Sequence, residues 1–196
     1  WYNDSSSWCG TLVLLALDPS FHLGLTVLST LSLNLKRFLM KDLKIGDNAP
    51  EFLINISENK QVSLKDLKGK YVVLYFYPKD DTPGCTLEAM DFNELLAEFT
   101  KLNTVILGVS KDNLKSHDKF KDKYSLKFNL GADTEADTCT KYSVIAEKSM
   151  FGKKYMGIKR ATFLIDPEGK IAHIWPKVSV EGHGRDVLEK IRSLSN

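Results

Sequence analysis

The amino-acid sequence predicts an α/β domain in which a central mixed β-sheet is flanked by helices. Two runs of β-branched and aromatic residues, at 70–78 and 104–110, are typical of strands buried on both faces. Stretches with helical spacing follow each run, and two final strands are separated only by the turn sequence PEGK at 167–170. Strands that alternate with helices and end in a hairpin favour a mixed sheet.

The first predicted elements are two short strands within 49–70, joined by the polar turn at 57–60, which form an N-terminal β-hairpin. The buried strand that follows ends at Pro78. After a loop that contains proline and glycine, residues 85–102 have helical spacing. Four apolar residues fall near one face of this helix: Leu87, Met90, Leu95 and Phe99.

The rest of the chain continues the alternation of strands and helices. The remaining predicted elements are a strand at 104–110, a basic helix at 111–124, a short strand at 128–130, a helix at 134–142, strands at 161–166 and 171–175, a turn at 182–184 and a last helix at 184–194.

Composition describes an ordinary globular chain. Its 196 residues are 43% apolar and 27% charged, which suffices for one domain with a core and excludes collagen-like, coiled-coil and wholly disordered classes. The 27 basic and 25 acidic residues nearly balance, so nothing favours nucleic acid as a partner. Three cysteines are too few for a disulfide framework and favour a reducing compartment, which predicts a cytoplasmic location.

The first 40 residues differ from the others. They contain eleven leucines and four charged residues, so the sequence predicts an apolar extension at 1–40 and one domain at 41–196. The uncharged run at 19–35 is at the short edge of a membrane-spanning helix and lacks the basic segment of a signal peptide, so membrane association is not favoured. Three interpretations stay open: a non-native or upstream-translated extension before a start at Met40, a weak membrane or targeting segment, and an extra helix.

Cys85 has the position of a nucleophile. It follows a buried strand and a short loop, at the start of a predicted helix. The free N–H groups and partial positive charge of a helix N-terminus favour a thiolate over a thiol, and the thiolate is the nucleophilic form. Position alone leaves a second interpretation open, which is a small buried apolar residue.

The residues around Cys85 form a specific motif. Pro78, Thr82 and Cys85 have the pattern P-x3-T-x2-C within the longer string YFYPKDDTPGCTLEA. The sequence thereby resembles the peroxiredoxins, and closely their bacterioferritin comigratory protein or peroxiredoxin Q subgroup. Three further strings fit the same subgroup: LGVSKDNLKSHDKF, FGKKYMGIKRATFLIDPEGKI and IWPKVSVEGH. The resemblance covers about residues 41–196, which it identifies as a thioredoxin-like peroxiredoxin domain.

The resemblance implies a thioredoxin-like fold and the reduction of hydrogen peroxide and organic hydroperoxides, in antioxidant defence. Cys85 matches the peroxidatic cysteine, and Thr82 the threonine whose hydroxyl contacts thiolate and substrate. Pro78 matches the proline that shields the pocket, and Arg160 the motif arginine. Such roles agree with the chemistry, because donors must hold both peroxide oxygens as charge moves to the leaving one, and a guanidinium keeps its charge and donates in a fixed fork.

The resolving cysteine that many members carry is missing from its usual positions. The sulfenic acid formed on Cys85 must be reduced. The resemblance places the resolving cysteine at positions that hold Met90 and Lys121 in this chain. The sequence therefore predicts a one-cysteine cycle, with thioredoxin, glutaredoxin or glutathione as the external thiol. A disulfide between Cys85 and Cys139 is the alternative, and Cys139 is expected to be a buried helix residue.

Other functions fit less well. A disulfide oxidoreductase would carry C-x-x-C, but Glu88 stands at the second cysteine position, and a copper chaperone would need a cysteine where Ala89 stands. A non-enzymatic redox sensor or holdase that uses the same thiol is the alternative to a peroxidase. The sequence predicts no cofactor, and a monomer or weak dimer.

The remaining charged and imidazole groups are given ordinary roles. The four histidines lack ligand spacing, so no metal site is predicted. His117 is expected on a solvated helix face. Glu88 could orient Arg160 or complement the helix dipole, and the dipole role is favoured.

Overall fold

The computed structural model describes residues 42–150 and 152–195, and the predicted extension at 1–40 lies outside them. The strands are β1 Leu53–Ser57, β2 Lys60–Ser63, β3 Tyr71–Phe76, β4 Thr104–Ser110, β5 Asn129–Ala132, β6 Ile145–Met150, β7 Lys153–Ile158, β8 Ala161–Ile165 and β9 Ile171–Trp175. The helices are α2 Pro83–Glu94, α3 Leu96–Lys101, α4 Leu114–Tyr124, α5 Asp137–Lys141 and α6 His183–Ser195, with a 3-10 turn η1 at Lys65–Leu67.

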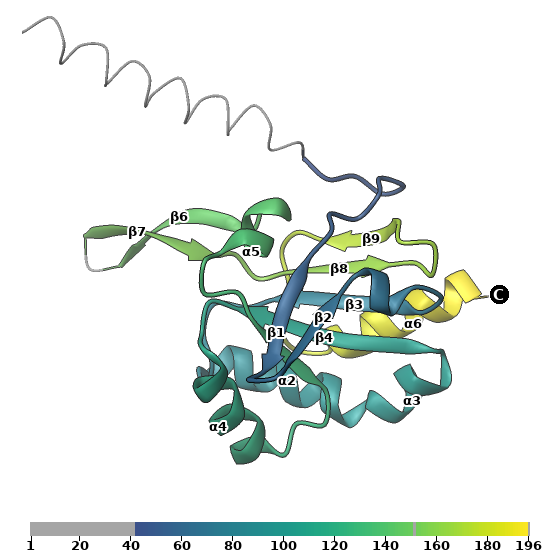
Figure 1. Ribbon diagram of the computed structural model, residues 1–196, viewed down its shortest axis with the longest axis horizontal. Coiled ribbons are helices and arrows are strands. Elements are labelled where there is room, and N and C mark those ends of the chain that lie inside the picture. Colours follow the sequence, from purple (N-terminus) through teal and green to yellow (C-terminus); the bar gives the residue numbers. More distant parts are fainter. Residues whose placement is uncertain (1–41, 151, 196) are drawn as a thin grey trace, which may run out of the picture. The chain divides into compact units, whose positions relative to one another are not determined.

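Seven of these strands form one mixed sheet in the order β2-β1-β5-β4-β3-β8-β9 (Figure 1). The β3–β4 and β4–β5 pairs are parallel, whereas the outer pairs are antiparallel. The predicted N-terminal hairpin is β1–β2, and the predicted closing hairpin is β8–β9. The predicted fold class, a mixed sheet flanked by helices, is therefore confirmed.

The central strand β3 is buried on both faces, as its sequence predicts. Val72, Leu74 and Phe76 point into one apolar cluster. Val73 and Tyr75 point into a second cluster on the other face of the sheet, because successive side chains of a strand alternate.

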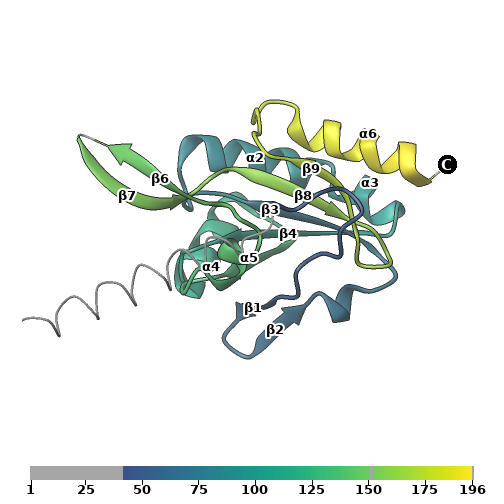
Figure 2. The same ribbon diagram turned by 90° about the horizontal axis from the view of Figure 1, so that it is seen from above.

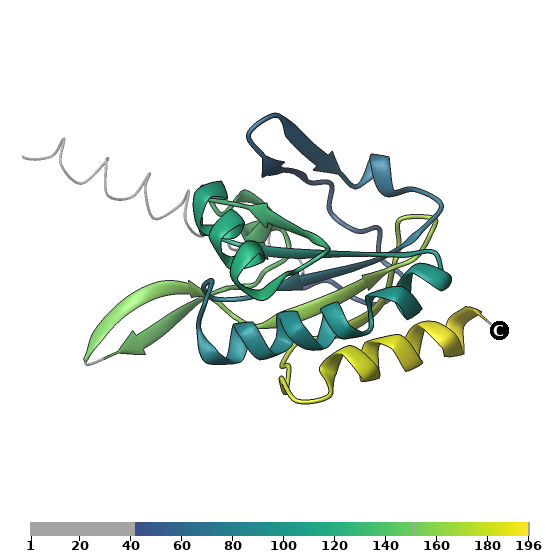
Figure 3. The ribbon, with the colours of Figure 1, turned by 90° about the horizontal axis from the view of Figure 1, so that it is seen from below.

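Helices cover the two faces unequally. The face that Tyr75 enters is packed by α2, α3, α4 and α6, which bury their apolar residues in the second cluster. Figures 2 and 3 show α2 and α6 side by side on this face of the sheet. The opposite face is covered by η1 and α5, whose Leu67 and Cys139 lie in the first cluster. The two cysteines of the described residues are thus on opposite faces of the sheet, since Cys85 lies in the second cluster.

The helix predicted at 85–102 differs from the structure in two ways. It is interrupted at Leu95, where the Glu98 N–H reaches back three residues to the Leu95 carbonyl and so makes a tighter turn between α2 and α3. The predicted apolar face is also wrong in part: Leu87 is 61% exposed and Met90 is 41% exposed, whereas Phe99 is buried and Leu95 packs against the same cluster. The face of α2 that is buried carries Cys85, Glu88, Ala89 and Phe92.

The hairpin β6–β7 is an element that the sequence reading missed. It pairs with no strand of the large sheet and projects from the body of the described domain (Figures 1 and 2). Its exposed residues include Tyr155 and Met156, so it lacks the alternating apolar pattern by which a strand is found. Among the helices of the described residues, none has the length and apolar character needed to cross a bilayer.

Candidate active site

The nucleophile candidate is placed by a short loop between β3 and α2. Tyr77 still belongs to the sheet, because its N–H donates to the Val109 carbonyl at 3.1 Å. The loop 78–82 then turns through Asp81, which has a left-handed φ of 55°. Thr82 precedes the helix and Pro83 occupies its first position, which proline favours because no intrahelical N–H is lost there.

Cys85 lies in the first turn of α2, as predicted, and is 1% exposed. The first N–H groups of a helix have no intrahelical partner, and the helix dipole is positive there. The sulfur therefore lies where negative charge is favoured and water is nearly excluded.

Arg160 contacts that sulfur directly. It lies between β7 and β8, and its Nη2 donates to the Cys85 Sγ at 3.1 Å. Its Nη1 donates to the carboxylate of Glu88. The sequence motif thus identified two residues, Cys85 and Arg160, that the fold brings together across 75 positions of the chain. The side chain of Arg160 is mostly buried, with 17% exposed, so solvent screens this contact weakly.

Glu88 forms the ion pair with Arg160, and the favoured interpretation of Glu88 as a partner of the helix dipole alone is wrong. Its position three residues after Cys85 puts both side chains on the inner face of α2. Burial raises the pKa of Glu88 to about 7, although the Arg160 guanidinium opposes this rise. Its Oε1 is buried and has no hydrogen-bond partner among the described residues. This carboxylate is therefore costly to ionise, and it depends on the arginine.

Gly84 leaves room for the guanidinium. A Cβ at this position would lie 3.3 Å from the Arg160 Nη2, which is tighter than ordinary van der Waals contact, and 3.9 Å from Val180. The glycine between Pro83 and Cys85 therefore permits the close approach of Arg160 to the helix N-terminus.

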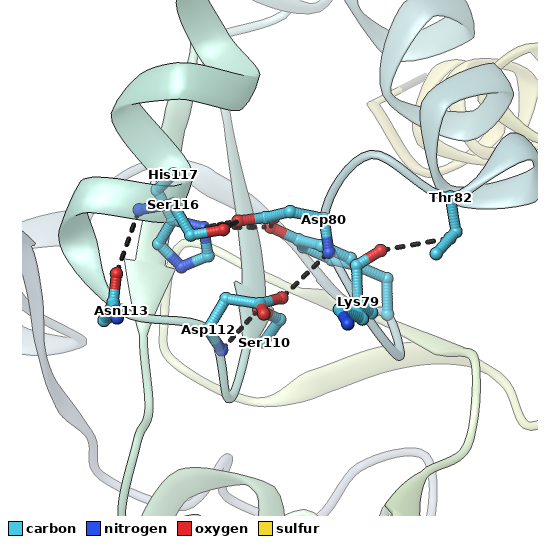
Figure 4. Close-up of polar contacts among 9 residues, drawn as sticks. Lys79, Asp80, Thr82, Ser110, Asp112, Asn113, Ser116 and His117 are labelled. Atoms are coloured by element: carbon cyan, nitrogen blue, oxygen red, sulfur yellow. Dashed lines mark hydrogen bonds and ion pairs between the residues drawn. The ribbon is translucent and has the colours of Figure 1, made fainter.

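The other two residues of the motif have different surroundings. The Thr82 hydroxyl donates to the Lys79 carbonyl at 3.1 Å, rather than to the Cys85 sulfur (Figure 4). A hydroxyl has one proton, so in this arrangement Thr82 can only accept a further hydrogen bond. Pro78 is exposed at the end of β3.

A buried polar cluster next to the loop is the part of the site that sequence reasoning missed. Asp80 is 7% exposed, and its carboxylate accepts hydrogen bonds from Ser116 and His117 (Figure 4). It also accepts one from the Tyr77 hydroxyl. The expectation that His117 lies on a solvated helix face is wrong, because its side chain is buried against Asp80 at 2.9 Å. The spacing of Phe120 three residues later, on the same buried face, is the signal that could have placed it.

His183 also differs from its predicted place. The turn expected at 182–184 is shorter, and α6 begins at His183 itself. Its Nε2 is 2.8 Å from the Thr162 hydroxyl, and burial lowers the pKa of its imidazole to about 4. His183 therefore stays neutral in the core.

Cys139 is buried in α5, as predicted. Burial, followed by the neighbouring Asp133, raises the pKa of its thiol well above the ordinary value. A disulfide requires two Cα atoms within about 7 Å. Since the sheet separates Cys85 from Cys139, a direct disulfide between them would require this fold to open.

No cluster of three or more His, Cys, Asp or Glu side chains within 42–150 and 152–195 is arranged to hold a metal ion. The reactive groups that the site brings together are the Cys85 thiol, the Arg160 guanidinium and the Glu88 carboxylate. A buried cysteine at a helix N-terminus, with an arginine on its sulfur, favours a thiolate nucleophile and is typical of the class of thiol enzymes.

Comparison with known proteins agrees with this class. The model of the AhpC/TSA family matches residues 45–174. Peroxiredoxin Bcp of Bacillus subtilis (strain 168) is 46% identical over 153 residues, which are 78% of this chain and 98% of that protein. Peroxiredoxin Bcp of Escherichia coli (strain K12) is 39% identical over 153 residues, with the same two coverages.

Solved structures give the same result. A structure of the bacterioferritin comigratory protein of Xanthomonas campestris, studied for its alkyl peroxide reduction activity, has a TM-score of 0.70 and 44% identity, covering 74% of this chain and 92% of that one. A PrxQ mutant of Xylella fastidiosa has a TM-score of 0.74 and 39% identity, covering 79% and 98%. The chain belongs to the AhpC/TSA family. It is a peroxiredoxin with the thioredoxin-like fold, a peroxidase that uses a thiol reductant.

Proposed function

We propose that Cys85 is the peroxidatic nucleophile of this enzyme and that Arg160 is its catalytic partner. The observation that carries the proposal is the 3.1 Å contact between the Arg160 Nη2 and the Cys85 Sγ. The positive guanidinium stabilises a thiolate, and its planar fork offers further N–H donors to an incoming peroxide. The helix N-terminus favours the same charge.

The reaction then proceeds by attack of the thiolate on one peroxide oxygen. The sulfur–oxygen bond forms while the oxygen–oxygen bond breaks, so the sulfur is oxidised to a sulfenic acid and the peroxide is reduced. The leaving oxygen departs as hydroxide or alkoxide and takes up a proton to become water or an alcohol. Negative charge moves from sulfur to the leaving oxygen, and Arg160 lies where it can stabilise both ends of this transfer.

The neighbouring residues support Arg160 and the substrate. Glu88 is a positioning residue, because its carboxylate holds Nη1 while Nη2 faces the sulfur. We assign Thr82 to contact with the peroxide, which requires its hydroxyl to turn from the Lys79 carbonyl. Pro78 is assigned to limiting the access of water at the mouth of the loop.

An external thiol completes the cycle. Its sulfur attacks the sulfenic acid and releases water, and a second thiol attacks the mixed disulfide and returns Cys85. An external thiol is proposed because the described residues of this chain offer Cys85 no second cysteine nearby. Met90 stands on α2 where many members of the subgroup that the sequence resembles carry a resolving cysteine, and Cys139 lies on the other face of the sheet. Thioredoxin, glutaredoxin and glutathione are the reductants we propose to compare. Each of them is maintained in a reducing compartment, which supports a cytoplasmic location.

The proposed unit of function is one domain at residues 41–196. The family model matches residues 45–174, within this part of the chain, and the proposed site residues Cys85, Glu88 and Arg160 also lie in it. We also propose that a monomer is active, and that any dimer is weak. Sedimentation of the active enzyme at its assay concentration tests this proposal.

The experiment that tests the site is peroxide consumption with each reductant in turn. Wild-type enzyme, Cys85→Ser and Cys139→Ser are compared with hydrogen peroxide and an alkyl hydroperoxide. We expect Cys85→Ser to lose all turnover and Cys139→Ser to keep it, because Cys139 is remote from Arg160. Equal turnover by wild type and Cys85→Ser would refute the assignment. A Cys85–Cys139 disulfide, found by non-reducing mass mapping after one equivalent of peroxide, would replace the one-cysteine cycle.

A further inference from the structure

The loop 78–82 determines where the nucleophile lies, and it has a single buried side chain. Pro78, Lys79 and Asp81 are exposed and Thr82 is partly exposed, whereas Asp80 is 7% exposed. The position of α2 relative to the sheet therefore depends on what holds Asp80.

Asp80 is held on both its side chain and its backbone. The side chain accepts hydrogen bonds from the Tyr77 hydroxyl at 2.7 Å, the Ser116 hydroxyl at 2.7 Å and the His117 Nδ1 at 2.9 Å. Its backbone N–H donates to the Asp112 carboxylate at 2.8 Å, which also accepts from Ser110. These contacts join β3, the loop, the end of β4 and the first turns of α4 (Figure 4).

His117 is the donor from α4 whose ring is buried against the Asp80 carboxylate. Its ring is 1% exposed, and Nδ1 faces the carboxylate, so Nδ1 carries the proton in this arrangement. Although burial favours the neutral acid, the hydrogen bonds from His117, Ser116 and Tyr77 lower the pKa of Asp80 below its ordinary value. A buried ionised carboxylate with three donors fixes a geometry that an apolar side chain could not specify.

A second, weaker tie runs along the surface. Asp81 accepts from the Lys123 ammonium at 2.7 Å and from the Tyr124 hydroxyl at 2.6 Å, both near the end of α4. Exposed pairs of this kind contribute little to stability. Two adjacent aspartates of the loop thus point to the same helix, and the buried one carries the constraint.

We propose that Asp80 and His117 are positioning residues for the peroxide reaction, acting together to hold the loop against α4 and so to aim the Cys85 sulfur along the oxygen–oxygen axis of the substrate. This inference rests on the proposed role of Cys85. It assigns no contact between either residue and the peroxide. Their function is to hold the Cys85 sulfur, the N-terminus of α2 and Arg160 in fixed relative positions while the sulfur–oxygen bond forms.

The test uses three substitutions of His117 that differ in one hydrogen bond. Asn carries its amide nitrogen on Cγ, as histidine carries Nδ1, so His117→Asn keeps a donor for Asp80. Gln places its nitrogen one atom further out, and Leu has none. The measurement is the rate constant for Cys85 oxidation by hydrogen peroxide, with the rate of alkylation by iodoacetamide and the thermal midpoint beside it.

We expect His117→Leu and His117→Gln to lower the oxidation rate constant by about tenfold or more, because misplacement by an ångström can cost about a hundredfold. His117→Asn should recover most of the rate. Alkylation should change less than oxidation, since the breaking of an oxygen–oxygen bond demands the in-line geometry. If His117→Leu does not fold, Ser116→Ala removes one of the three donors more gently and should lower oxidation by a smaller factor.

Asp133→Asn is the matched control. Asp133 is also 7% exposed, and its carboxylate accepts two backbone N–H groups of α5, near Cys139 and on the other face of the sheet from Cys85. It should lower the thermal midpoint and leave the oxidation rate unchanged. An oxidation rate constant of His117→Leu equal to that of wild type would overturn the inference. Equal reductions of the rate constant in His117→Asn and His117→Gln would also overturn it. Wild-type protein whose Cys85 is not oxidised at all would instead refute the proposed function.

Discussion

The Arg160 Nη2 donates to the sulfur of Cys85 at 3.1 Å while the Nη1 of the same guanidinium is held by Glu88, one helical turn further along α2. Two separate nitrogens of one planar group thus bind the proposed nucleophile and its neighbour on the same helix face. A lysine ammonium is a single point of charge and cannot hold both in this geometry.

Arg160→Lys should therefore keep the positive charge at the site but slow the oxidation of Cys85. We expect the rate constant for oxidation by hydrogen peroxide to fall at least about tenfold, which corresponds to ~1.4 kcal/mol in the barrier. Stopped-flow oxidation of the reduced enzyme measures it. Arg192→Lys is the matched control, because Arg192 also pairs with a glutamate, Glu98, but at the surface. A rate for Arg160→Lys within twofold of wild type would contradict the role of the fork.

Gly84→Ala should separate stability from activity. Alanine is better than glycine in a helix by up to about 1 kcal/mol, and this gain opposes the cost of moving Arg160 from the buried Glu88, so the free energy of unfolding should change by no more than about 1 kcal/mol. The added Cβ would meet the Arg160 Nη2 at 3.3 Å and displace the guanidinium, so peroxide oxidation should slow several-fold. Oxidation kinetics beside urea unfolding measure both quantities.

A double-mutant cycle shows whether the effect of Gly84→Ala passes through Arg160. If the alanine acts by moving the guanidinium, it should cost little more once Arg160→Lys is present. Full additivity of the two losses would mean that Gly84→Ala acts through another group.

The orientation of α2 shows where sequence periodicity stops being informative. Spacing alone placed Leu87 and Met90 on an apolar face with Leu95 and Phe99. Phe99 is buried, but the two residues that lie in α2, Leu87 and Met90, are exposed. The inner face is occupied by Cys85 and Glu88, a thiol and a carboxylate that an apolar pattern does not count. Ala89 and Phe92 pack into the core from this inner face, so Cys85 and Glu88 face Arg160 while Leu87 and Met90 face solvent.

Alanine substitutions along α2 test this orientation. Leu87→Ala and Met90→Ala should each change the free energy of unfolding by no more than about 0.5 kcal/mol, as surface substitutions do. Phe92→Ala should cost about 3 to 5 kcal/mol, because its fully buried ring packs on Tyr75 and Phe99. Urea unfolding of the three variants decides the matter. Larger losses of unfolding free energy in Leu87→Ala and Met90→Ala than in Phe92→Ala would contradict this orientation of α2.

The sequence predicted the buried strands well because their signal is local, whereas it missed the exposed hairpin β6–β7. The runs that became β3 and β4 are apolar on both faces, so burial could be read from them directly. The hydrogen bonds that hold the loop 78–82 through Asp80 were not predictable in this way. Asp80 and His117 are 37 positions apart, and each looks like a solvated residue until the fold brings α4 against the loop. Arg160 was found only through the resemblance to the peroxiredoxins, which the string FGKKYMGIKRATFLIDPEGKI carries.

Glu88→Gln should change how stability depends on pH. The pKa of Glu88 is raised from 4.5 to about 7, so the folded state holds this proton more tightly than the unfolded state does. Its contribution to stability is therefore complete below pH 4.5 and is lost as the pH rises through about 7. At about 1.36 kcal/mol for each pH unit, the loss amounts to roughly 3 kcal/mol. Glutamine has no such proton, so the advantage of wild type over Glu88→Gln should shrink from about pH 5 to about pH 8.

Urea unfolding of both proteins at the two pH values measures this difference. Groups that titrate equally in the two proteins cancel in the comparison, which leaves the proton of Glu88. Glu98→Gln, which removes the carboxylate of the surface pair with Arg192, controls for the loss of a glutamate that binds arginine. A difference between wild type and Glu88→Gln that is the same at both pH values would contradict the raised pKa. The ionised Glu88 carboxylate accepts from Nη1 of Arg160. Deprotonation of Glu88 with rising pH should therefore strengthen its ion pair with Arg160 while the free energy of unfolding falls.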